Sequence, residues 1–295
     1  MGVSCYTVSV IKKERCCSYD RSGNRRYRGP RFEFCGIKTK HFDLLDPNCF
    51  FTDDTVMTAA VAKALMALGK EIISKPAENR LKIETALISQ MRSFGKKYPN
   101  AGYGTRFSLW LRAKQPKPYG SFGNGSAMRV SPCALAANSI QNALELAEIS
   151  ASVTHNHPEG VKGAKAVAAA VYLARHGSSK AQIKEFIESY FYKFDFTLAK
   201  IRPGYSFNET CQGSVPEAIE AFLESTSFED ALRNAVSLGG DSDTIAAITG
   251  SIAFAFFDRD PSSRLGDAVL IRRAQYCLTP ELRKIVRDFE EFIKE

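Results

Sequence analysis

Two short acidic segments contain the side chains of this sequence that are best suited to chemistry. Residues 52–55 read TDDT and residues 239–244 read GGDSDT, and each segment directly precedes a long apolar pattern with helical spacing. Carboxylate and hydroxyl oxygens are the ligands that hard cations such as Mg²⁺ and Mn²⁺ prefer, often with water and substrate completing the coordination shell. The two segments together therefore predict a divalent-metal site.

Each segment taken alone has a simpler interpretation as a helix cap. Thr and Asp are preferred N-cap residues, and acidic side chains are favoured in the first turn of a helix. A cap needs one side-chain oxygen, however, whereas each segment offers two carboxylates together with hydroxyl groups. Capping leaves the surplus oxygens unexplained. Gly239 and Gly240 would let the backbone approach a neighbour closely, although they could equally end the preceding helix.

From residue 50 onward, the apolar spacing predicts helices almost throughout. The first two follow the helical period over Thr55–Leu68 and Ala77–Phe94, and each stops at a glycine, Gly69 and Gly95. No run of alternating strand residues and no internal repeat is evident, which favours a single all-α domain. Further helices are predicted over Cys133–Ser152, Pro158–His176, Lys180–Tyr192, Pro216–Glu224, Glu229–Leu238, Thr244–Phe257 and Pro280–Lys294, with N-caps at Ser227 and Thr279.

A long segment from Lys96 to Ser131 interrupts this helical pattern. Loops of such length are usually functional or disordered, and the aromatic content of this one argues against disorder. Residues 120–129 read GSFGNGSAMR, and their glycines would let backbone N–H groups converge on a phosphate or a sugar, although an ordinary turn fits the pattern equally well. Gly102 and Gly104 form a second flexible turn, which could also be plain loop.

Two histidines lie directly before the helix predicted at Pro158, where residues 154–158 read THNHP. No set of Cys, His or Asp with suitable spacing completes a tetrahedral zinc site around His155 and His157. A neutral imidazole at a helix start can instead bind a ligand by a hydrogen bond or stack on a base, and local capping or packing is an equal alternative.

Composition limits the classes of protein to which the chain can belong. It has 295 residues and 44% hydrophobic content, which is ordinary for a globular protein. Its 8 cysteines include no C-x-x-C pair and no compact framework, which predicts reduced thiols in a cytoplasmic protein. No secretory signal is visible, and the longest apolar run, Ile245–Phe257, is too short to cross a bilayer. We therefore expect a cytoplasmic monomer with no membrane partner.

The net charge of +8 is concentrated at the N-terminus, because residues 1–30 alone carry a net charge of +5. A basic arm can bind nucleic acid by charge, yet short basic segments are more often simply solvated. Nucleic acid is therefore an unlikely partner. The chain is divided accordingly into an atypical basic segment, residues 1–30, and a domain over residues 31–295.

Four motifs occur in the order seen in one known family: residues 51–55, 120–129, 154–158 and 239–244. Over about residues 31–258 the chain resembles the ADP-ribosylglycohydrolase family, in particular its bacterial members related to dinitrogenase reductase-activating glycohydrolase. The resemblance implies a compact, single-domain orthogonal helical bundle with two Mg²⁺ or Mn²⁺ ions in a central cleft. It also implies hydrolysis of the glycosidic bond that joins ADP-ribose to a modified group.

The resemblance assigns roles to individual residues as well. It implies that Glu33 acts in catalysis beside the metals, together with Asp54 and Asp243. A carboxylate there can stabilise an oxocarbenium-like sugar while it activates water or protonates the leaving atom. The implied metal ligands are Thr52, Asp53, Asp54, Asp241, Asp243 and Thr244, and the implied substrate-binding residues are Gly102, Gly104, Ser121, Phe122, Gly123, Asn124 and His155.

The first thirty residues depart from the family pattern. Members usually begin with a Gly-rich apolar helix that has a Gly-Asp pair shortly before the early glutamate, whereas residues 21–30 here read RSGNRRYRGP. We expect a metal-dependent hydrolase that acts on an ADP-ribosylated protein or a small ADP-ribose conjugate. The alternative is a catalytically impaired ADP-ribose-binding protein, in which the altered N-terminus misplaces Glu33. The sequence does not indicate which bond between ADP-ribose and the modified group would be cleaved.

Overall fold

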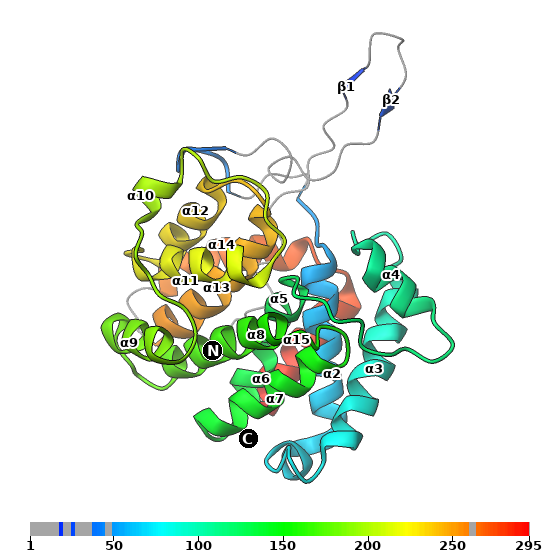
Figure 1. Cartoon of the computed structure of the whole chain (residues 1–295). Coiled ribbons are helices and arrows are strands. Elements are labelled where there is room, and N and C mark those ends of the chain that lie inside the picture. The colour runs from blue at the N-terminus through cyan, green and yellow to red at the C-terminus, as the bar shows by residue number, and fades with distance from the viewer. Residues whose placement is uncertain (1–17, 20–24, 27–36, 45–48, 260–263, 295) are drawn as a thin grey trace.

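The chain folds into a bundle of helices, seen in the computed structural model (Figure 1). This confirms the predicted all-α fold. Two very short strands, Ser18–Tyr19 (β1) and Arg25–Arg26 (β2), pair antiparallel. Among the helices described, none is long and apolar enough to cross a membrane. The structure describes residues 18–19, 25–26, 37–44, 49–259 and 264–294.

The helices are short to medium in length and are joined mostly by tight connections (Figure 1). In chain order they are α2 (Asp53–Ile73), α3 (Arg80–Lys97), α4 (Thr105–Arg112), α5 (Gly125–Met128), α6 (Ser131–Ala136), α7 (Ile140–Ser152), α8 (Pro158–Arg175), α9 (Lys180–Tyr190), α10 (Leu198–Ile201), the 3₁₀ helix η2 (Cys211–Gly213), α11 (Val215–Leu223), α12 (Phe228–Ser237), α13 (Ser242–Phe257), α14 (Arg264–Tyr276) and α15 (Pro280–Phe292).

Helix α8 occupies the centre of the bundle, where it packs against α5, α6, α7, α9, α11, α13 and η2. Its sequence is rich in Ala and Gly, and small side chains allow neighbouring helices to approach closely. At Gly163, a Cβ atom would lie 2.5 Å from the Cys211 sulfur. The packing along α8 therefore leaves little room for larger side chains.

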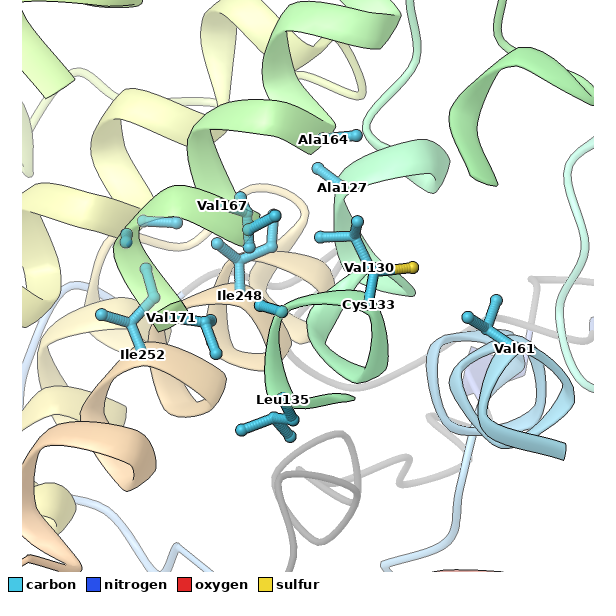
Figure 2. Close-up of a cluster of buried hydrophobic side chains, with 14 of the residues drawn as sticks. Val61, Ala127, Val130, Cys133, Leu135, Ala164, Val167, Val171, Ile248 and Ile252 are labelled. Carbon is cyan, nitrogen blue, oxygen red and sulfur yellow. The ribbon is translucent and has the colours of Figure 1, made fainter. Parts of the chain in front are cut away.

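The apolar core lies where α2, α5, α6, α8 and α13 meet, and Figure 2 shows its side chains. Val61 of α2, Val167 of α8 and Ile248 of α13 are all buried there. Each buried aliphatic side chain of this kind contributes about 1.5–3 kcal/mol to the stability of the fold. Because the two acidic segments lie at the N-terminal ends of α2 and α13, this core fixes where one segment lies relative to the other.

Most of the predicted helices are present. α8 and α13 closely match the predicted ranges Pro158–His176 and Thr244–Phe257. Both predicted N-caps are confirmed, since Ser227 accepts a hydrogen bond from the Asp230 amide and Thr279 accepts one from the Leu282 amide. Local chemistry therefore sets these helix ends, as the sequence indicated.

Three helix predictions were wrong in detail. The helix expected over Cys133–Ser152 is broken into α6 and α7, because Ser139 caps a new helix by accepting a hydrogen bond from the Asn142 amide at 3.1 Å. Gly69 has a positive φ of 78° and kinks the first helix, but helical turns continue beyond it. The long segment before residue 131 contains α4 and α5, and α4 escaped detection because only Trp110 among its side chains is buried.

Candidate active site

A cavity of about 430 Å³ lies at the N-terminal ends of α2 and α13. The two acidic segments, the 102–104 turn, the glycine-rich loop and one histidine all contribute to its wall. Segments far apart in the sequence therefore line one cavity. The predicted site residues that line the cavity are Thr52, Asp53, Asp54, Gly102, Gly104, Ser121, Gly123, Asn124, His155, Asp241, Asp243 and Thr244.

We call the part of the cavity formed by the six predicted metal ligands the acidic wall. Thr52 and Asp241 occupy the N-cap positions of α2 and α13, yet neither side chain makes a capping hydrogen bond. The Thr52 hydroxyl donates instead to Oδ2 of Asp54 at 2.9 Å. Oδ2 of Asp241 accepts a hydrogen bond from the side-chain amide of Asn124 at 2.6 Å. Capping therefore does not explain either acidic segment.

Two carboxylate oxygens of the acidic wall, Oδ1 of Asp54 and Oδ1 of Asp243, are buried without a hydrogen-bond partner. Burial, followed by the nearby carboxylates of Asp243 and Asp53, holds the pKa of Asp54 well above its usual range. Burial and Asp243 likewise raise the pKa of Asp241 well above its usual range. Buried carboxylates that lie close together are unfavourable unless a positive charge compensates them.

The donor set of the acidic wall fits a hard divalent cation. In the described part of the chain, no group of three or more His, Cys, Asp or Glu side chains could hold a metal ion by itself. Mg²⁺, however, is usually bound through one or two carboxylates, with water and substrate phosphates as the remaining ligands. The unpartnered oxygens of Asp54 and Asp243, with the hydroxyls of Thr52 and Thr244 beside them, match that pattern.

The glycine-rich loop, residues 120–125, is held in place by backbone hydrogen bonds to the segment that precedes η2. The Asn124 amide donates to the carbonyl of Glu209 at 2.8 Å, and the Cys211 amide donates to the carbonyl of Phe122 at 2.9 Å. The Asn124 side chain then connects this loop to Asp241 of the acidic wall. The position of the loop is therefore coupled to that of the carboxylates.

Close packing also explains why two positions beside the cavity are occupied by glycine. Gly240 has a φ of 70°, and a Cβ atom there would lie 2.8 Å from the carbonyl oxygen of Ser206. At Gly160, in the first turn of α8, a Cβ atom would lie 2.6 Å from the carbonyl oxygen of Ser121. Any side chain at either position would push a neighbouring loop away from the cavity.

The two histidines lie in different surroundings, and local capping is observed for His157. His157 is the N-cap of α8 and accepts a hydrogen bond from the Glu159 amide at 3.2 Å. His155 is buried in the cavity wall, and its Nδ1 lies 2.6 Å from the Thr154 hydroxyl. Burial, reinforced by the positive charge of Arg129, holds the pKa of His155 well below its ordinary value, so its imidazole is neutral at pH 7.

Several lining residues were missed by sequence reasoning. Arg106 lies 4.9 Å above the Tyr119 ring, whose centroid is 5.6 Å from that of His155, so the three form a column along the wall. Phe207 and Glu209 come from the loop between α10 and η2. That loop has no motif that would have identified it. Arg129, by contrast, closes the predicted GSFGNGSAMR motif, whose arginine could have been recognised as a candidate.

Two predicted site residues are not placed in the cavity. Phe122 is not among its lining residues; its side chain is 43% exposed and its ring packs edge-on against His157. Glu33 lies outside the described residues, so its catalytic role stays a prediction.

The fold and the cavity define an all-α protein with a carboxylate-rich site beside a glycine-rich loop. The chain belongs to the ADP-ribosylglycohydrolase family, because the model of that family matches residues 11–259. A solved structure described as an ADP-ribosylglycohydrolase-related protein complex has the same fold, with a TM-score of 0.62 and 21% identity over 98% of this chain and 95% of that one.

The chain is also similar in sequence to proteins of several organisms. ADP-ribosylhydrolase ARH3 of Homo sapiens is 28% identical, with 72% of each chain covered. ADP-ribosylarginine hydrolase Tri1 of Pseudomonas putida is 27% identical, with 70% of this chain and 58% of that protein covered. An uncharacterized protein of Archaeoglobus fulgidus is 31% identical over 68% of this chain and 70% of its own length.

Proposed function

We propose that this protein is a metal-dependent hydrolase that cleaves the glycosidic bond between ADP-ribose and a modified protein side chain or a small conjugate. The observation that carries the proposal is the pair of buried carboxylate oxygens, on Asp54 and Asp243, that have no protein partner in the cavity. Membership of the ADP-ribosylglycohydrolase family supports the reaction class. The names of two relatives, ARH3 and Tri1, point to the same class.

The acidic wall would hold two Mg²⁺ or Mn²⁺ ions, with Thr52, Asp53, Asp54, Asp241, Asp243 and Thr244 as candidate ligands. Bound there, the ions would orient the ribose hydroxyls and lower the pKa of a water molecule. The protein supplies the rigid frame for this chemistry, because the apolar core fixes α2 relative to α13. The Asn124 side chain adds a fixed connection between Asp241 and the glycine-rich loop.

The rest of the cavity would bind the ADP-ribose portion of the substrate. Ser121, Gly123 and Asn124 of the glycine-rich loop lie where the diphosphate and ribose would contact the backbone, with Gly102 and Gly104 nearby. The column formed by Arg106, Tyr119 and His155 offers positive charge, an aromatic face and hydrogen bonding to the same ligand.

Glu33 is our candidate for the residue that acts on the scissile bond. We expect the Glu33→Ala variant to lose turnover while it retains most of its affinity for ADP-ribose, since an interaction made mainly in the transition state affects kcat more than binding. An equal loss of turnover and of affinity for ADP-ribose would make Glu33 a binding or structural residue.

The test is release of free ADP-ribose by the purified protein from arginine-linked and serine-linked ADP-ribosylated protein. Each reaction is run with Mg²⁺, with Mn²⁺ and with chelator. Asp53→Ala and Asp243→Ala should lose at least about a hundredfold in turnover, the usual scale for removing a preorganised electrostatic group. Asp195→Ala is the matched control, because Asp195 is exposed and does not line the cavity.

Metal-dependent release that both site variants lack and the control retains would support the proposal and identify the linkage. Full activity in chelator, or in either site variant, would contradict the metal centre. ADP-ribose binding without release from either substrate would instead support the impaired binding protein. A monomeric state and a cytoplasmic location stay predictions from the sequence.

A further inference from the structure

Arg129 is the largest fully buried side chain among the residues that the structure describes, with 1% of its surface exposed. Its guanidinium donates to the carbonyl oxygens of Gly125 at 2.7 Å and Ser150 at 2.9 Å, and to the hydroxyl of Thr154 at 2.8 Å. Burying a cation among neutral acceptors costs free energy, so apolar packing alone does not account for an arginine at this position. The position of Arg129 therefore calls for an explanation beyond stability.

The Thr154 hydroxyl connects Arg129 to His155, and it has only one hydrogen to donate. A guanidinium is always a donor, so the hydroxyl uses one lone pair to accept from Arg129. Its own hydrogen has two possible acceptors: Nδ1 of His155 at 2.6 Å and the carbonyl oxygen of Ala151 at 3.4 Å. The shorter distance favours donation to Nδ1.

The opposite tautomer, with the proton on Nδ1 of His155, would leave the Thr154 hydroxyl with a weaker set of hydrogen bonds. If Nδ1 of His155 carried the proton, the hydroxyl of Thr154 would accept twice and could donate only along the long 3.4 Å contact to Ala151. A neutral imidazole whose Nδ1 accepts a hydrogen bond must carry its proton on Nε2.

The Nε2 atom of His155 faces the glycine-rich loop. Cβ atoms built on Gly125 and Gly123 would lie 3.2 Å and 3.6 Å from it. His155 also lines the cavity, and Tyr119 packs against the imidazole ring with a centroid distance of 5.6 Å. A proton on Nε2 would therefore be available to an oxygen atom of a ligand beside that loop.

We propose that Arg129 and Thr154 are positioning residues that fix His155 as the Nε2–H tautomer, so that this histidine is a constant hydrogen-bond donor to a ligand oxygen in the cavity. The acceptor would be a phosphate or ribose oxygen of ADP-ribose, and this identification of the ligand rests on the proposed function. The tautomer itself follows from the hydrogen-bond geometry around a neutral imidazole and does not depend on the proposed function.

The first measurement is the imidazole ¹⁵N spectrum of the ligand-free protein at pH 7.5. The chain has only 4 histidines, and His155→Gln identifies the signals of His155. We expect Nε2 of His155 to be protonated and Nδ1 to be an acceptor. Protonation on Nδ1, or on both nitrogens, in the wild-type protein would overturn the inference without the need for any variant.

The second measurement compares Thr154→Val, which removes the hydroxyl at nearly constant shape, with Thr154→Ser, which keeps it. We expect Thr154→Val to lose the single tautomer and to bind ADP-ribose about tenfold more weakly, as for the loss of one hydrogen bond, whereas Thr154→Ser should restore both properties. Thr85→Val, at an exposed residue outside the cavity, is the control for the same chemical change.

An unchanged His155 tautomer in Thr154→Val would overturn the role of the hydroxyl. Failure of the wild-type protein to bind ADP-ribose would contradict the proposed function, while the spectrum of the ligand-free protein would still decide the inference. The two failures are therefore distinguishable.

Discussion

The acidic wall and the network of Arg129, Thr154 and His155 share one cavity but differ in the charge that they bury and in what surrounds it, although Nε of Arg129 also lacks a hydrogen-bond partner. In the acidic wall, buried carboxylate oxygens of Asp54 and Asp243 lack partners. In the network, the guanidinium, the hydroxyl and Nδ1 of the imidazole are joined by short hydrogen bonds. Like charges gather in the first region, whereas a single buried cation is surrounded by acceptors in the second.

This difference indicates what each region needs from outside the protein. The acidic wall has surplus negative charge, so a divalent cation would stabilise it. The network is assembled by the fold itself and needs no ion to hold its geometry. We infer that removing a side chain from the network should destabilise the protein, whereas neutralising one carboxylate of the acidic wall should stabilise the metal-free protein.

The largest expected change is caused by Arg129→Met, which would leave the acceptors on Gly125, Ser150 and Thr154 unpaired. Each buried unsatisfied acceptor is costly, and we expect the free energy of unfolding to fall by about 4 kcal/mol. Chemical denaturation measures this value. Arg106→Met, at an exposed arginine on the rim of the same cavity, should change it by less than about 1 kcal/mol. Similar losses in the two variants would refute the distinction.

A partly buried carboxylate outside the cavity, Glu217, shows what burial does to an acid that has no charged neighbour among the causes of its pKa shift. Burial raises its pKa from the ordinary value of about 4.5 to about 7, and its Oε2 lacks a hydrogen-bond partner. The stabilising contribution of its bound proton is present below about pH 4.5 and is lost as the pH rises through about 7.

The wild-type protein should therefore lose about 2 kcal/mol of stability relative to Glu217→Gln between about pH 5 and pH 8. Denaturation curves at several pH values measure this difference. The matched control is Glu185→Gln, since Glu185 is exposed on α9. Parallel pH profiles for the wild-type protein and Glu217→Gln would show that Glu217 does not titrate in this range.

The smallest expected change is caused by Asp54→Asn in the presence of chelator. This substitution removes one of several neighbouring negative charges at nearly constant volume. We therefore expect the free energy of unfolding to increase by about 1 kcal/mol, which raises Tm by a few degrees. Mn²⁺ should then stabilise the wild-type protein more than the variant. A variant that is much less stable than the wild-type protein in chelator would show that the acidic wall carries no electrostatic strain.

The sequence predicted those parts of the fold and site whose signals are local. Helical spacing located α2 and α13, and the residue types TDDT and GGDSDT marked their N-terminal ends as candidate ligand segments, which the structure brings to one cavity. Ser227 and Thr279 marked helix starts because capping needs only the residue and its next turn.

Features that depend on distant partners were not predictable in this way. The break between α6 and α7 was missed because Ala136 and Ala137 continue an apolar pattern across it. The burial of Arg129 was not predicted, since its acceptors on Ser150 and Thr154 come from another part of the chain. Glu209 lines the cavity because of the way its loop folds, and the sequence of that loop contains no motif that would have indicated this.

Whether the acidic wall holds divalent cations is tested most directly by titrating Mn²⁺ into the metal-free protein with ADP-ribose present and following the free ion by electron paramagnetic resonance. We expect two ions to bind each wild-type chain, and Asp54→Asn to weaken at least one of them by an order of magnitude or more. Equal binding to the two proteins, or no binding to the wild-type protein, would contradict a metal centre at Asp54 and Asp243.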